Sequence, residues 1–413
     1  MTTKTTQIKR SALGGAMIIA GTAVGAGMLS TPMATAGIWF TGSILLLIYT
    51  WFCMYMSGLM IMETNLNYPL GTGFHTMVTD LLGKFWNSLN SISITFVLYI
   101  LTYAYISGGS SIIVSSFPDS DIITQPIAGL VFAIVVTLIV WLSTKAVDRI
   151  NTILIGGMVI SFIISVSNMF THVDLNILFD KQSSDPSYLP YAFAALPYLL
   201  ASFGYHGNVP GLVKYYNKDM RAVSRSLLYG TLFALVIYIL WQYVIQGNIS
   251  REAFKVILTK GGNAGDLFTQ LDKSQLISHF SQRLLTFFGY MALASSFLGV
   301  SLGLFDYIAD FFKFSDDKSG RTKSALITFL PPTIAAITLP NGFIYAIGYA
   351  GLAATIWAAI IPAMMAYAAR KRFPNESYRT PGGTFMVVFV IIFGLLNATA
   401  HILASFDMLP IYK

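Results

Sequence analysis

The residues best placed to bind a ligand are glycines inside a long apolar stretch near the N-terminus. This stretch, 11–38, contains Gly21, Gly25 and Gly27 around its centre and Pro32 beyond them. Each interior glycine costs a helix about 1 kcal/mol relative to alanine, so we expect the helix to unwind there. Unwound backbone at membrane depth is tolerated where it faces protein or a water-filled cavity, and its peptide groups can then hold a polar ligand. Close packing of a second helix against the glycines is the alternative.

A second apolar stretch, 188–213, has the same kind of interruption. Gly204 and Gly207 bracket a tyrosine and a histidine, and Pro210 prevents a regular helix from simply continuing. Two interrupted spans at corresponding places in two halves of a chain are typical of paired repeats whose broken helices meet near the middle of the membrane. The second stretch therefore favours a binding site over close packing alone.

The peptide groups at these two breaks predict a site for a zwitterion. We expect the amides of Gly25, Ala26 and Gly27 to bind a carboxylate, because the N-terminal end of a half-helix attracts anions. We expect the carbonyls of Ala23 and Phe203 to accept hydrogen bonds from an ammonium group. Neither stretch contains a charged side chain, and an amino acid bound by peptide groups needs none.

Aromatic and polar side chains near the breaks predict the pocket for the ligand's side chain. The residues expected to shape it are Tyr103, Tyr205, His206, Asn208 and Tyr349. Such rings can line an apolar pocket, and their polar tips can bond an indole N–H or a phenol. Ordinary packing is the alternative for each ring, and a structural hydrogen bond is the alternative for His206.

Composition places these stretches in a polytopic membrane protein. Of 413 residues, 55% are hydrophobic and only 10% are charged, whereas a soluble protein carries about 25% charged residues. The first stretch is too long for the apolar core of a signal peptide, so we interpret it as a permanent helix. The spans are expected at 11–38, 40–62, 85–114, 126–143, 150–171, 188–213, 223–246, 280–305, 324–340, 343–369 and 384–406.

The charges between the spans predict the orientation in the membrane. Most of the 25 Lys and Arg residues fall on one side if the N-terminus is cytoplasmic, as the positive-inside rule requires. An odd number of spans then places the C-terminus on the outer side of the membrane. The net charge of +7 is thus a feature of the membrane surface and not of a nucleic-acid site. We expect a short surface helix at 251–259.

The sequence offers no arrangement for catalysis. It contains no metal-ligand cluster, phosphate-binding loop or nucleophile–base pair, and the single Cys53 excludes an internal disulfide. We therefore predict that the protein is not an enzyme and carries no cofactor. Glu63, Asp306 and Asp310, which close spans, are expected at helix interfaces or at a cytoplasmic gate rather than in the ligand site.

Along nearly its full length the chain resembles the hydroxy and aromatic amino acid permease family of bacteria. The segments that carry the resemblance are 19–28, 63–68, 97–107, 202–210, 294–300 and 304–307. The resemblance implies an all-α LeuT-type fold, with inverted five-helix repeats at 11–171 and 188–369 and an eleventh helix at 384–406. It also implies import of an aromatic amino acid across the bacterial inner membrane. The segments 207–210 and 214–216 look closer to the tryptophan permeases than to the tyrosine-specific branch.

The coupling ion is left open between a proton and sodium. Proton-driven relatives of this fold carry a fifth-span amine, and the tryptophan permeases have a lysine where 156–159 stands here, but Met158 cannot ionise. A sodium site resembling those of the fold is expected at Gly21, Val24, Ala292, Ser295 and Ser296. Hydrogen bonds of the two serines to their own helix are the alternative.

We predict from these features a symporter that imports L-tryptophan, driven by a cation gradient. A tyrosine-preferring or broad aromatic permease is the alternative. A channel would need a continuous polar lining, and a transporter-like receptor would need a cytoplasmic signalling domain, for which the inside loops are too short. We expect an amino acid and the lipid bilayer as partners, with no nucleic acid and no obligate protein partner.

Overall fold

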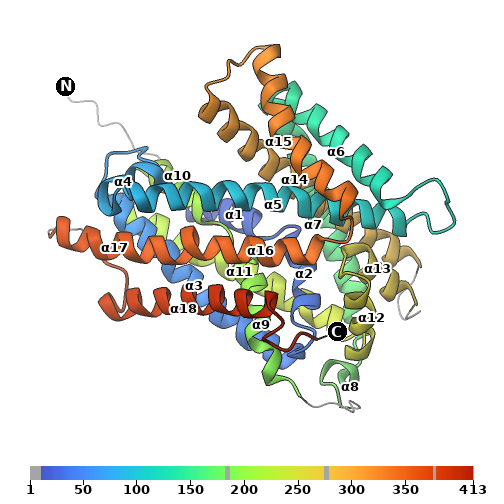
Figure 1. The fold of residues 1–413 in the computed structure, drawn as a ribbon. Helices are drawn as coiled ribbons and strands as arrows, with labels where there is room; N and C mark the ends of the chain where they lie inside the picture. The colour runs from blue at the N-terminus through green and yellow to red at the C-terminus, as the bar shows by residue number, and fades with distance from the viewer. Residues whose placement is uncertain (1–10, 182–186, 274–278, 375–377, 413) are drawn as a thin grey trace.

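The computed structural model describes residues 11–181, 187–273, 279–374 and 378–412, which are helical almost throughout (Figure 1). Among these residues there is no β-strand. The long unbroken helices are α3 (Trp39–Leu66), α5 (Lys84–Ser115), α6 (Gln125–Leu142), α7 (Thr144–Phe170), α11 (Met220–Gln246), α14 (His279–Phe312), α15 (Lys318–Thr338) and α18 (Gly383–Ser405). The predicted all-helical class is confirmed.

The first span is broken where its glycines predict. It consists of α1 (Ala12–Ala23) and α2 (Gly27–Ala34), which meet at an angle of 57°. Between them Val24 leaves the helical conformation, with φ −78° and ψ 107°. Glycine has more backbone freedom to lose on entering a helix than other residues, so leaving the helical conformation costs less free energy near the glycines.

The sixth span is also interrupted as predicted. It consists of α9 (Ala192–Ser202), the single turn η2 (His206–Asn208) and α10 (Val209–Tyr215). The tenth span contains a feature that the sequence did not predict, a π-helical turn η3 (Ile356–Ile360) between α16 (Phe343–Thr355) and α17 (Ile361–Arg372). Such turns occur mostly as local bulges inside α-helices.

Fewer spans are long and apolar enough to cross a membrane than the eleven predicted. In the described part of the chain eight single helices meet that requirement, and the bent pair of α1 and α2 makes a ninth. The sixth span is missing from this count because its two halves are short. The predicted span 324–340, the ninth along the chain, is missing because basic residues (Lys318, Arg321 and Lys323) occupy the start of α15 and shorten its apolar part.

Short helices connect the spans. They are α4 (Phe74–Leu82), α8 (Leu175–Leu178), η1 (Leu189–Tyr191), α12 (Arg251–Thr259) and α13 (Ala264–Lys273). The first of the two in the long loop, α12, forms at the predicted bounds, but Arg251 is buried rather than exposed. Its guanidinium donates to the carbonyls of Ala36 and Gly37, just beyond α2, and pairs with Asp180 at 3.5 Å.

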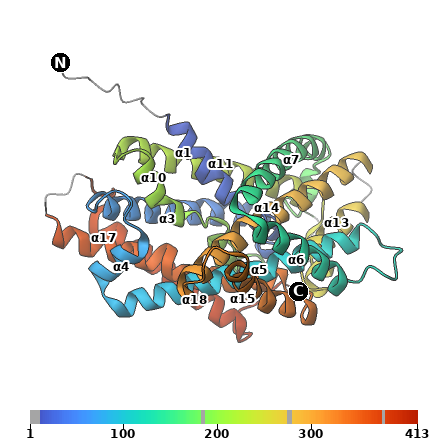
Figure 2. The ribbon, with the colours of Figure 1, turned by 90° about the horizontal axis from the view of Figure 1, so that it is seen from above.

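The broken spans lie inside the bundle. α5 and α16 run side by side along the molecule (Figure 1), and α16 also contacts α9. Seen from above, α1 lies beside α11, while α7 lies beside α14 (Figure 2). α2 in turn packs on α9 and α11. The two breaks are therefore enclosed by the seventh and eighth spans, α11 and α14, whose side chains contact them.

Candidate functional site

The break in the first span presents backbone amides. The Ala26 N–H donates to Ser296 Oγ of α14 at 3.0 Å. On either side of it, the amides of Gly25 and Gly27 make no hydrogen bond to any residue that the structure describes. These two donors stand at the N-terminal end of α2, where the helix dipole favours an anion. The arrangement is suited to a carboxylate.

Gly25 leaves no room for a side chain. A Cβ atom at this position would lie 2.6 Å from Ser296 Oγ, well inside the van der Waals distance. Glycine therefore lets Ser296 Oγ approach the Ala26 amide in this geometry, in addition to its effect on the flexibility of the backbone. Gly27 is less restricted, because a Cβ there would lie 3.6 Å from Ser202 Cα.

The carbonyls at the ends of the first half-helices converge on one tyrosine. Tyr238 Oη, from α11, lies 2.6 Å from Ala23 O at the end of α1 and 2.6 Å from Ser202 O at the end of α9. The ring of Phe203 packs edge-on against Tyr238, with 5.2 Å between ring centroids. Tyr238 and Ser202 were not predicted from the sequence.

The predicted acceptor on Phe203 is already engaged. Its carbonyl accepts the Tyr205 N–H at 3.0 Å, and its side chain is fully buried. The carbonyl that lies beside Tyr238 together with Ala23 O is that of Ser202, one residue earlier. The sequence places the sixth-span break correctly but cannot tell which carbonyl of the last turn is left without an intrahelical donor.

Tyr205 and His206 lie inside the sixth-span break but face the second span. Tyr205 Oη donates to Met54 O at 2.9 Å, and His206 Nε2 lies 3.2 Å from the same carbonyl. Because a carbonyl only accepts, Nε2 carries the proton in this contact. Both side chains are fully buried, and their rings stack at 4.5 Å. The structural hydrogen bond that was the alternative for His206 is thus present.

Asn208 joins the two broken spans on the side opposite α2. Its amide donates to Thr22 Oγ1 at 2.6 Å, and Thr22 is exposed. Gly21, the preceding residue of α1, is also exposed. This part of the first span is therefore exposed at the surface of the bundle, as are Leu13, Met17 and Ile18 of the same helix, whereas residues 28–33 of α2 are all buried.

Tyr103 and Tyr349 are not brought to the breaks. Tyr103 Oη donates to Leu339 O at 2.7 Å, and the ring of Tyr349 packs on His401 of α18. Both line a separate cavity of about 540 Å³ at the start of α16. Residues two apart on a helix point to opposite sides, and it is Tyr105 that α5 buries in the same core cluster as Phe203 and Tyr238.

The predicted ion-binding residues are only partly gathered. Ser296 lies at the first-span break, but Ser295 Oγ donates to Ala292 O within its own helix at 3.1 Å. Met158, in the position expected of a fifth-span amine, is buried on α7.

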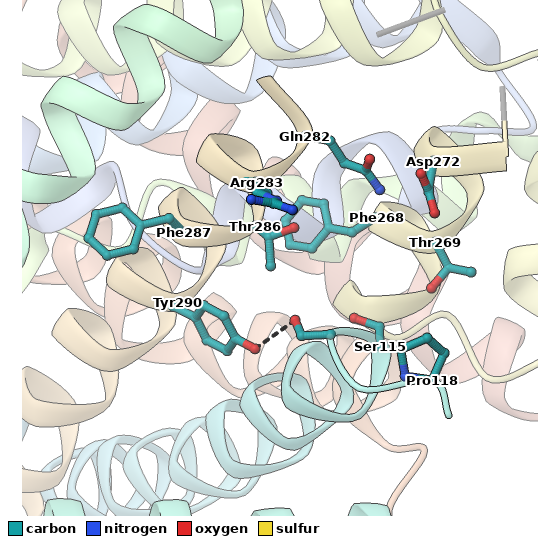
Figure 3. Close-up of a pocket in the computed structure, with 11 residues that line it drawn as sticks. Ser115, Pro118, Phe268, Thr269, Asp272, Gln282, Arg283, Thr286, Phe287 and Tyr290 are labelled. Carbon is teal, nitrogen blue, oxygen red and sulfur yellow. Dashed lines mark hydrogen bonds between the residues drawn. The ribbon is translucent and has the colours of Figure 1, made fainter. Parts of the chain in front are cut away.

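A further cavity lies away from the breaks, between the end of α5 and the helices α13 and α14 (Figure 3). It has a volume of about 560 Å³, and at its edge Tyr290 Oη donates to Ser116 Oγ at 2.8 Å. Arg283 and Asp272 line it with Phe268. None of the residues predicted from the sequence to bind substrate or ion lies there.

Comparison with known proteins identifies the family. The sequence model of the tryptophan/tyrosine permease family matches residues 8–401. The chain belongs to this family. It is similar to the tryptophan-specific transport protein of Pseudomonas aeruginosa (strain UCBPP-PA14), with 56% identity over 98% of this chain and 97% of the relative. The protein of the same description from Haemophilus influenzae is 55% identical, with 96% of each chain covered.

The fold of this permease is shared with a protein of known structure. A crystal structure of MhsT in complex with L-phenylalanine matches it with a TM-score of 0.61, covering 96% of this chain and 98% of that one, at 14% identity. The predicted LeuT-type fold class is confirmed, and the permease is an integral membrane transport protein rather than an enzyme.

Away from the breaks, a buried ion pair ties together the second and tenth spans of the permease. Glu63 is fully buried and accepts two hydrogen bonds from Arg370, at 2.6 and 2.9 Å, and one from the Thr380 N–H at 2.7 Å. The expectation that Glu63 is an interface residue is confirmed. Asp306 and Asp310 are exposed on α14.

We expect Ser296→Ala to destabilise the permease by about 1–3 kcal/mol, because the buried Ala26 amide loses its acceptor. Thermal unfolding of the purified protein in detergent measures the effect. Ser295→Ala is the matched control, since that hydroxyl bonds only its own helix and its loss should change stability by less than about 0.5 kcal/mol. Equal unfolding temperatures for the two variants would contradict the role of Ser296.

Proposed function

We propose that this permease is a symporter that imports L-tryptophan across the bacterial inner membrane. The observation that carries the proposal is the pair of amides on Gly25 and Gly27, which make no hydrogen bond within the described residues and lie at the break beside the converging half-helix ends. Such a site can bind the carboxylate and ammonium groups of an amino acid through peptide groups alone, with no ionised side chain of the protein. The two relatives described as tryptophan-specific transport proteins support the choice of side chain.

Substrate binding follows from the polarity of the half-helices. The amides of Gly25 and Gly27 donate to the carboxylate, and the carbonyls of Ala23 and Ser202 accept from the ammonium. Phe203, buried at the sixth-span break, supplies an apolar wall near the ring. Transport requires that the substrate and the ion favour one conformation over the other, since a ligand shifts an equilibrium only by its differential affinity.

We propose that the accessible end of the first span faces the cytoplasm. The burial of 28–33 supports a path that is closed on the outer side, and we propose that it opens on the inner side, next to the exposed Gly21 and Thr22. The basic residues between spans support a cytoplasmic N-terminus and a periplasmic C-terminus. We further propose that 11–171 and 188–369 are inverted repeats, since each begins with a broken span.

The proposal predicts saturable accumulation of radiolabelled tryptophan in liposomes that contain the purified permease, when a cation gradient is imposed. Unlabelled tyrosine should compete more weakly than unlabelled tryptophan. Equal competition would favour a broad aromatic permease. Flux that does not saturate and never exceeds the external concentration would instead support a channel.

We propose a proton as the coupling ion, as the family resemblance implies, with sodium as the second candidate. The placement of Ser296 at the first-span break favours sodium. With proton coupling, accumulation should collapse with a protonophore and survive replacement of sodium by choline at fixed pH. With sodium coupling, choline should abolish accumulation, and Ser295→Ala should weaken it.

A further inference from the structure

Tyr238 occupies an unusual electrostatic position between the two broken spans. Its hydroxyl lies 2.6 Å from the last carbonyl of α1, on Ala23, and 2.6 Å from the last carbonyl of α9, on Ser202. The side chain is fully buried, and the ring of Phe203 packs against it. The hydroxyl is therefore held in place by packing on the ring as well as by its own hydrogen bonds.

A neutral hydroxyl is an unexpected group at this position. The C-terminal end of a helix carries a partial negative charge, so two such ends that face each other repel. In transporters with broken helices, half-helix C-terminal ends coordinate the cation. A phenol also has only one proton, so at any moment one of the two carbonyls accepts it and the other does not. The three oxygens together have more acceptors than donors.

We propose that Tyr238 is a positioning residue whose hydroxyl stands in for a cation between the two half-helix ends. It holds the carbonyls of Ala23 and Ser202 at a fixed spacing, and the surplus acceptors of the three oxygens orient the substrate's ammonium group. The geometry supports this, since the hydroxyl oxygen lies within hydrogen-bond distance, 2.6 Å, of both carbonyls at once although it can donate to only one of them. The ammonium part of the proposal rests on the proposed function, whereas the stand-in for a cation does not.

Uptake kinetics test the positioning role. Tyr238→Phe keeps the ring and removes the hydroxyl, and we expect the KM for tryptophan to rise about tenfold or more, with a smaller change in kcat. Tyr243→Phe is the matched control on the same helix, because Tyr243 packs on Phe40 and Phe170 through its ring. An unchanged KM in Tyr238→Phe would overturn the proposal.

Thermal stability, measured without substrate, tests whether the Tyr238 hydroxyl takes the place of a cation. Tyr238→Ala leaves space between the two carbonyls, and we expect sodium or lithium chloride to raise its unfolding temperature relative to choline chloride by more than in the wild-type permease. The same unfolding temperature in all three salts, or failure to fold in all three, would overturn the proposal. Because this measurement uses no tryptophan, it distinguishes failure of the inference from failure of the proposed function.

Discussion

Replacement of Gly25 by leucine is expected to abolish tryptophan uptake while leaving the permease in the membrane. A Cβ atom alone would lie 2.6 Å from Ser296 Oγ, so a leucine side chain must displace Ser296 from the Ala26 amide. It would also stand next to the amides of Gly25 and Gly27, where we propose that the carboxylate binds. Hydrogen bonds to a charged group contribute about 1.5–3 kcal/mol each, so loss of two should reduce uptake by roughly a hundredfold or more.

The experiment compares uptake at equal amounts of permease in the membrane. Gly14→Ala is the matched control, because Gly14 lies in the same span and its Cβ would make an ordinary contact, 3.8 Å from Tyr215 Oη. This variant should transport like the wild type. If Gly25→Leu also took up tryptophan normally, the assignment of the carboxylate to this break would have to be withdrawn.

The parts of the site that depend on local sequence could be predicted. Glycines and prolines change the preference of the backbone where they stand, so both breaks lie where the residues indicate, around Gly25 and Gly204. The same holds for α12, whose bounds are those expected. α7 begins earlier than predicted because Ser143 caps it, accepting the Ala146 N–H, and hydropathy does not detect helix that extends beyond the membrane.

The parts that depend on tertiary packing could not be predicted. Tyr238 is 215 residues from Ala23 in sequence, yet its hydroxyl completes the first-span break. Nothing in the local pattern of α11 distinguishes this tyrosine from others on membrane helices. Tyr103 and Tyr349 illustrate the opposite error, since their type suits a ring pocket, but the rotation of α5 and α16 directs them to another cavity. Helix rotation follows from packing between spans, which a single sequence does not specify.

The second large effect is expected at the ion pair between the second and tenth spans. Glu63→Gln removes the carboxylate that pairs with Arg370, and the side chain of Arg370 is only 8% exposed. Removing one partner of a buried ion pair typically costs about 3–5 kcal/mol, because the remaining charge stays in a low-dielectric environment. We therefore expect a large fall in unfolding temperature in detergent and little folded protein in the membrane.

A double replacement separates loss of charge balance from loss of packing. Glu63→Gln combined with Arg370→Gln removes both members of the ion pair and should recover part of the stability, because the penalty for a buried charge that has lost its carboxylate is gone. The nearby pair of Arg372 and Asp80, at 2.9 Å with side chains 51% and 35% exposed, is the control. Asp80→Asn should cost at most about 1 kcal/mol, since solvent screens an exposed pair. If Glu63→Gln were as stable as Asp80→Asn, the buried pair of Glu63 and Arg370 would contribute no more to stability than the exposed pair.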